Sequence, residues 1–133
     1  MTTRASGTFD VKLSPLQGHH ASEPTLGRMA LDKVLHGDLE ATGRGEMLTA
    51  GTDVKGSAGY VAVERITGRL HGRTGSFAMQ HSGAMSRGAW QTTITVVPDS
   101  GTGELAGIAG AFHLSIREGK HFYDLDYTLP EPA

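Results

Sequence analysis

The 133-residue sequence contains no cysteine. This absence excludes a disulfide framework, a thiolate nucleophile, and zinc or iron–sulfur sites ligated by cysteine. The sequence also lacks an apolar run of the ~20 residues that a membrane-spanning helix needs. Its first residues lead into no apolar segment of the kind found in secretory signals. We therefore expect a cytoplasmic protein without a membrane partner.

Neither sign of charge is in excess. Twelve Lys and Arg residues against fourteen Asp and Glu residues give a formal net charge of -2, and the two signs are interspersed. Nucleic-acid binding is not expected, because it needs a basic face or stripe. The seven histidines include no His-x-His pair, the spacing that places two ligands on one face of a strand. We therefore predict no metal site and no cofactor.

Glycine, in contrast, is abundant, with 19 residues spaced singly along the chain. Single glycines at such intervals are typical of turns, bulges and curved strands. The length indicates one domain, residues 1–133, large enough to bury a core. Together with alternating apolar and polar residues, these features predict an all-β fold. A closed antiparallel barrel of eight strands, over about 5–129 with a short tail at 130–133, is favoured over a sandwich.

The alternation indicates where the strands lie. It predicts strands at residues 8–13, 26–36, 39–49, 59–70, 75–85, 90–96 and 104–116, and a last strand after a turn at Glu118-Gly119. A loop with His19-His20 separates the first two. Residues 26–36 also have helical spacing, but their short length and flanking glycines favour a strand. In this second hairpin Lys33 shares a side with Leu31 and Leu35, and the mixed pattern leaves its inner face unassigned.

Tight turns set the pairing of the later strands. Turns at Arg87-Gly88 and Glu118-Gly119 predict pairs of residues whose numbers sum to 175 and 237. A turn at Gly72-Arg73 predicts a sum of 145, which places Glu64 opposite His81 on an otherwise apolar face. A carboxylate in a barrel interior is costly unless it is paired.

Glu64 and His81 are therefore the candidate catalytic residues. As a hydrogen-bonded acid and base they could move a proton to or from a bound ligand. The alternative is a structural ion pair that fixes the register of two strands.

Large apolar and aromatic side chains in phase with the inner face are candidates to line a pocket for an apolar or aromatic small molecule. They are Tyr60, Met79, Met85, Trp90, Phe112, Tyr123 and Tyr127. An ordinary barrel core would use the same residues.

Four segments carry a family resemblance: LHGDLEATGRGEMLTAGT, KGSAGYVAVERITGRLHGRTGSFAMQHSG, VVPDSGTGELAGIAG and FYDLDYTL. They resemble a family of small bacterial proteins classed as a domain of unknown function, DUF3224, over about residues 5–129. That family looks related to the allene oxide cyclase-like barrels, which implies an eight-stranded antiparallel barrel with an internal cavity. The resemblance implies no reaction, and no catalytic residue of the cyclases has a match here.

Three functions remain open from the sequence. The first is a barrel that binds an apolar or aromatic small molecule in its lumen. The second is a cofactor-free isomerase or cyclase that uses Glu64 and His81. The third is a structural or homo-oligomeric protein with a filled barrel, whose outward Val61 and Val63, and Leu31 and Leu35 of the unassigned hairpin, would supply an interface.

Overall fold

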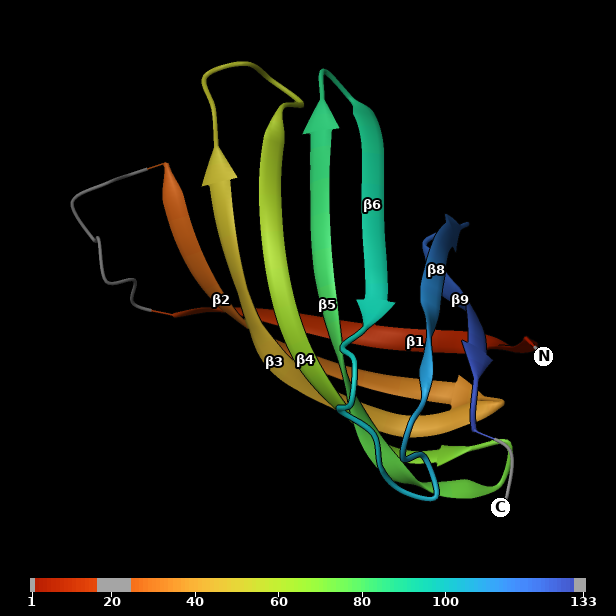
Figure 1. Ribbon diagram of the computed structural model, residues 1–133. Coiled ribbons are helices and arrows are strands. Elements are labelled where there is room, and N and C mark those ends of the chain that lie inside the picture. Colours follow the sequence, from red (N-terminus) through yellow and green to blue (C-terminus); the bar gives the residue numbers. More distant parts are fainter. Residues whose placement is uncertain (1, 17–24, 131–133) are drawn as a thin grey trace.

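The computed structural model describes residues 2–16 and 25–130, and within them the fold is all-β (Figure 1). The strands are β1 (Thr3–Leu16), β2 (Leu26–Gly37), β3 (Leu39–Gly51), β4 (Ala58–Leu70), β5 (Arg73–Ser86), β6 (Ala89–Val96), β7 (Thr102–Gly103), β8 (Ala109–Arg117) and β9 (Lys120–Thr128). The described residues contain no helix that is long and apolar enough to cross a membrane. The predicted loop histidines His19 and His20 and the end of the tail lie outside the described residues.

Eight of the strands close into an antiparallel barrel, which confirms the predicted fold. Their order around the ring is β1, β2, β3, β4, β5, β6, β8 and β9, and β9 pairs with β1 again. β6 and β8 meet at the pair Thr95 and Ala111. The two-residue strand β7 is an addition to the ring and pairs with the start of β5.

Three hairpins close with two-residue turns in which both residues have positive φ: His71-Gly72, Arg87-Gly88 and Glu118-Gly119. This backbone matches the right-handed twist of the flanking strands. The second and third turns, with their sums of 175 and 237, were predicted correctly.

The first of these turns was predicted one residue too late, so the predicted sum of 145 is wrong and the pairs of β4 and β5 sum to 143. Ala62, not Glu64, is opposite His81. Because side chains alternate with a period of two, this two-unit error leaves Glu64 and His81 on the same face, as diagonal neighbours.

The predicted strand at 104–116 is also wrong at its beginning. Residues 104–107 form a turn, and β8 begins at Ala109. The amide of Leu105 donates to the carbonyl of Thr102, and the amide of Ile108 donates to the carbonyl of Leu105. Both side chains are nevertheless 1% exposed, so they join the core from a loop.

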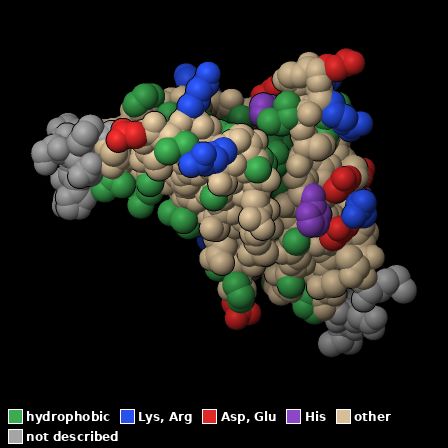
Figure 2. Space-filling model, turned by 90° about the horizontal axis from the view of Figure 1, so that it is seen from above, with side chains coloured by type: hydrophobic (Ala, Val, Ile, Leu, Met, Phe, Trp, Pro, Cys, Tyr) green, Lys and Arg blue, Asp and Glu red, His purple; other side chains and the backbone are tan. Residues whose placement is uncertain are grey.

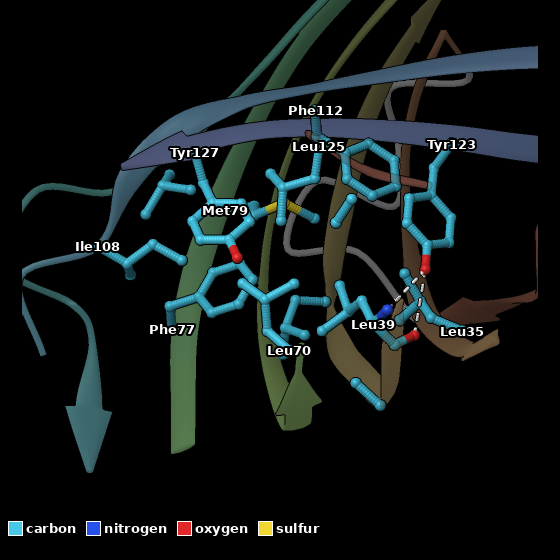
Figure 3. Packing of buried hydrophobic residues seen from close by; sticks show 14 of the residues in the cluster. Leu35, Leu39, Leu70, Phe77, Met79, Ile108, Phe112, Tyr123, Leu125 and Tyr127 are labelled. Carbon is cyan, nitrogen blue, oxygen red and sulfur yellow. Dashed lines mark hydrogen bonds between the residues drawn. The ribbon is translucent and has the colours of Figure 1, made fainter. Parts of the chain in front are cut away.

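The apolar core fills one end of the barrel (Figure 3). On one side it packs against β8 and β9, and on the other against the ends of the strands that the β2–β3 and β4–β5 turns connect. Tyr123 shows how its polar groups are satisfied. Its hydroxyl accepts a hydrogen bond from the amide of Leu39 at 3.0 Å and lies 3.0 Å from the carbonyl oxygen of His36, to which it donates. Burial raises the pKa of Tyr123 to about 12. This contact ties β9 to the β2–β3 hairpin.

At the opposite end, the inner face of β4, β5 and β6 is partly uncovered. These strands extend beyond β8 and β9 (Figure 1). Tyr60, Met85 and Thr92 are half-buried there, and Trp90 is 56% exposed. We call these four residues the inner ledge.

Candidate functional site

Three ionisable side chains meet inside the barrel: Lys33 of β2, Glu64 of β4 and His81 of β5. Lys33 Nζ lies 2.9 Å from Glu64 Oε2, and His81 Nε2 is hydrogen-bonded to the same oxygen. The residues are 4%, 1% and 7% exposed. The predicted contact between Glu64 and His81 is therefore present, and it belongs to a triad.

Strand β3 lies between Lys33 and Glu64, and a glycine lets the two side chains meet across it. Gly43 pairs with Lys33 on one side and with Ile66 on the other. A Cβ atom at Gly43 would lie 2.7 Å from Glu64 Oε1. A larger residue would therefore displace the carboxylate.

Lys33 also lies between two aromatic rings. Its Nζ is 5.0 Å from the ring centre of Phe9 and 5.2 Å from that of Phe112. The faces of aromatic rings attract a cation, so both rings help to hold the buried ammonium group.

Glu64 is held in its charged form. Burial by itself would raise the pKa of Glu64, but the hydrogen bond from His81 and the positive charge of Lys33 outweigh it. The pKa of Glu64 is therefore lowered below its ordinary value. A carboxylate only accepts hydrogen bonds, so His81 Nε2 carries a hydrogen and donates it to Glu64.

The lowered pKa of Glu64 predicts acid sensitivity. A carboxyl group with a lower pKa in the folded state adds stability above its unfolded pKa, which is about 4.3. That stability is lost as the pH falls through the lower folded pKa. Urea unfolding between pH 7 and pH 3 should therefore show a steeper loss of free energy in the wild type than in a Lys33→Met/Glu64→Leu variant. Parallel pH curves for the two proteins would contradict this expectation.

The other ring nitrogen of His81 is Nδ1. Among residues 2–16 and 25–130, no group is hydrogen-bonded to His81 Nδ1. The fully buried side-chain atoms without a partner in that part of the chain are Glu64 Oε1 and Thr92 Oγ1. Nδ1 therefore retains some exposure, and the side chain of His81 is 5% exposed.

The inner ledge lies next to His81. The ring of Tyr60 contacts the imidazole edge-on, with 6.3 Å between ring centres. Tyr60 also stacks on Trp90, with 6.1 Å between centres and 15° between planes. Gly83 pairs with both Tyr60 and Thr92, and a side chain at Gly83 would collide with the Tyr60 ring and approach Thr92 Oγ1. The glycine thus lets Tyr60 lean over β5 beside the histidine.

The seven predicted pocket residues fall into two groups. Met79, Phe112, Tyr123 and Tyr127 are at most 4% exposed and pack together in the core (Figure 3). Tyr60, Met85 and Trp90 lie on the ledge. The second group is therefore the part of the predicted set that an outside molecule can reach.

A family model described as "Protein of unknown function (DUF3224)" matches residues 5–127. The chain belongs to this family. A crystal structure of a DUF3224 protein of unknown function from Shewanella oneidensis MR-1 is 50% identical, covers 100% of both chains and has a TM-score of 0.93. Comparison with curated proteins gives no match. The family resemblance is thus confirmed, whereas the relation to allene oxide cyclase barrels stays a prediction.

This DUF3224 chain has a second candidate surface on the outside of the barrel. A hollow of about 1200 Å³ crosses the outer face of β2 to β6 and is lined partly by Leu48, Val61 and Val63. Each of these three is more than half exposed. At its edge Arg28 and Glu46 form an ion pair at 2.7 Å. On the face shown in Figure 2, hydrophobic side chains are interspersed with charges of both signs.

The exposure of the four expected interface residues can be compared with the prediction. Val61 and Val63 are outward and exposed, as predicted. Leu31 and Leu35 are 3% and 1% exposed because they point into the barrel on either side of Lys33, so their proposed place in an interface is wrong. Self-association through the two valines stays a prediction.

Lys33 is the member of this chain's triad that sequence reasoning missed. It was placed on the side of Leu31 and Leu35, but that side was not assigned to the interior. The signal was present: two leucines flank Lys33 at a spacing of two, and a lone charge in such a row needs a buried partner.

Two atoms of the triad have no partner among the described residues: Glu64 Oε1 is fully buried, and His81 Nδ1 is the one that can take part in proton or hydrogen-bond chemistry. Lys33 and His81 both donate to Glu64, so the free Nδ1 of His81 is left as an acceptor or base. Among the described parts of the chain, no three His, Asp or Glu residues are grouped as metal ligands.

Proposed function

We propose that this protein binds an aromatic or apolar small molecule on the inner ledge, with His81 as its polar contact. The observation that carries the proposal is a buried histidine beside the Tyr60–Trp90 stack whose Nδ1 has no hydrogen-bond partner among the described residues. Flat aromatic surface next to a few placed polar groups is typical of small-molecule sites.

The cost of the triad supports a functional role. Removing charges from water is expensive, and apolar side chains of similar volume often stabilise a core as well as a buried ion pair does. Lys33, Glu64 and His81 are therefore hard to explain by stability alone. Buried ionisable groups with specific charge partners are candidates for functional sites.

The outer hollow offers less for recognition of a small molecule. Its exposed ionic groups, Arg28 and Glu46, are paired with each other, and His81, which also lines it, is 7% exposed. The fully buried atoms without partners in the described residues, Glu64 Oε1 and Thr92 Oγ1, belong to the triad and the ledge. Unsatisfied polar groups favour a site where a ligand can supply the missing partner.

Fluorescence can test the proposal, because Trp90 is the one tryptophan of the chain. We expect the neutral dye N-phenyl-1-naphthylamine to bind saturably and to quench Trp90 by energy transfer. Tyr60→Ala should weaken binding roughly tenfold, since it removes the ring that stacks on Trp90.

Val61→Ser and Val63→Ser are the matched controls, because they change the outer hollow and leave the ledge intact. We expect both variants to bind the dye as the wild type does. The proposal is wrong if no saturable binding occurs. It is equally wrong if the valine variants lose binding while Tyr60→Ala keeps it.

A further inference from the structure

We infer that the ligand is a neutral aromatic hydroxyl compound, such as a phenol or naphthol, and that Lys33 is the residue that sets this preference. The inference rests on the proposed function and adds the chemical class of the ligand. Lys33 acts through Glu64 and His81, so it is a positioning residue and does not itself touch the ligand.

The first step concerns which ring nitrogen of His81 carries the hydrogen. Nε2 donates its hydrogen to Glu64 Oε2. A neutral His81 therefore carries no hydrogen on Nδ1, and this nitrogen offers a lone pair on a ring that lies beside Tyr60 of the ledge. Such an atom accepts a hydrogen bond from a hydroxyl group and repels a carboxylate.

The second step is the charge of the cluster. Lys33 and Glu64 already neutralise each other at 2.9 Å, in a site where the three residues are at most 7% exposed. A second proton on His81 would leave one uncompensated positive charge in the core, where burial disfavours it. Lys33 thus supplies the positive charge that balances Glu64, and His81 contributes only the hydrogen on Nε2.

The third step is what happens without Lys33. In Lys33→Met the charge of Glu64 would have no ammonium partner, and an imidazolium at His81 is the remaining group that can balance it. Nδ1 would then be a donor. The same site should change from preferring a hydroxyl to preferring an anion.

The ledge supplies the rest of the recognition. Tyr60 and Trp90 form a stack that an aromatic ring can extend, with 15° between their planes. Thr92 Oγ1 is buried without a partner in the part of the chain that the structure describes, and it can donate to a ligand oxygen. A hydroxyl group can both accept a hydrogen bond from a threonine and donate one to an imidazole nitrogen, which a methyl group or a carboxylate cannot.

Three ligands of nearly the same shape test the inference: 2-naphthol, 2-methylnaphthalene and 2-naphthoate. Their affinities are measured by displacement of N-phenyl-1-naphthylamine from the wild type and from Lys33→Met. The control is Lys12→Met, which removes an exposed positive charge from β1. Thermal melting confirms that each variant is folded.

We expect the wild type and Lys12→Met to bind 2-naphthol about tenfold more tightly than the other two compounds. In Lys33→Met, 2-naphthoate should bind more tightly than 2-naphthol. Equal wild-type affinities for 2-naphthol and 2-methylnaphthalene would overturn this inference and leave the proposed function standing. If Lys33→Met folds but keeps the wild-type order, Lys33 does not set the preference. Failure of all three compounds to bind would overturn the proposed function as well.

Discussion

Replacing Glu64 with leucine should lower the free energy of unfolding by about 3–5 kcal/mol. The variant leaves Lys33 in the core at 4% exposure, with two aromatic rings but no counter-ion. A buried charge without a partner is among the few causes of such large losses, in a domain whose total stability is about 5–15 kcal/mol. Guanidinium chloride unfolding at pH 7 measures the change.

The matched control removes both charges. Lys33→Met/Glu64→Leu fills the same space with apolar atoms, so it should recover most of the lost stability. If the double variant is no more stable than Glu64→Leu alone, the loss comes from packing and not from an unpaired charge. If Glu64→Leu is as stable as the wild type, Lys33 does not depend on Glu64 for its burial.

Phe112→Ala should have a loss of similar size, about 3–5 kcal/mol. Phe112 is 2% exposed, stacks on Tyr123 with 5.4 Å between ring centres, and contacts the ammonium group of Lys33. Its truncation creates a cavity in the core and removes one of the two rings that hold the cation. Thermal and denaturant unfolding give the magnitude.

Phe122 is the natural control because it lies on the adjacent strand β9 and points to the other face. It is half-buried, and its ring contacts the guanidinium group of Arg117 at 4.0 Å. Phe122→Ala should cost well under half as much as Phe112→Ala, since solvent can fill the space it leaves. Equal losses at the two positions would mean that the barrel interior is not the main source of stability.

The fold could be predicted largely from alternation and turns. Glycine follows the first turn residue at His71-Gly72, Arg87-Gly88 and Glu118-Gly119, and two of these turns were identified at the right residues. The turn at His71-Gly72 was misplaced by one residue because Gly72 fits either position of a two-residue turn in the sequence pattern. Glu64 and His81 were still assigned to the correct face, because the face depends only on whether a residue's position in its strand is odd or even.

The site could be predicted in part. The contact that was missed joins strands that are not neighbours. Glu64 and His81 are on neighbouring strands, so local pairing brings them together. Lys33 reaches Glu64 across an intervening strand at Gly43, and single-strand periodicity carries no information on such a contact. Similarly, alternation identifies Tyr60 and Phe112 as inward-facing but does not indicate that β8 and β9 end before the ledge.

The double variant that lacks both charges should keep its stability but lose its ligand preference. Lys33→Met/Glu64→Leu is expected to stay folded, because methionine and leucine can fill the core. It should nevertheless lose the preference for a hydroxyl ligand, because nothing then fixes the hydrogen on Nε2 of His81. The role of the triad would thus be to hold the hydrogen of the His81 imidazole on Nε2.

The most direct test of this account is the ¹⁵N NMR spectrum of the histidine rings at pH 7, with His81 assigned by its absence from a His81→Phe variant. The account predicts a protonated Nε2 and an unprotonated Nδ1 for His81 in the wild type, and two protonated nitrogens in Lys33→Met. A wild-type His81 with a hydrogen on Nδ1 would contradict it, because the triad would then present a donor to the ledge.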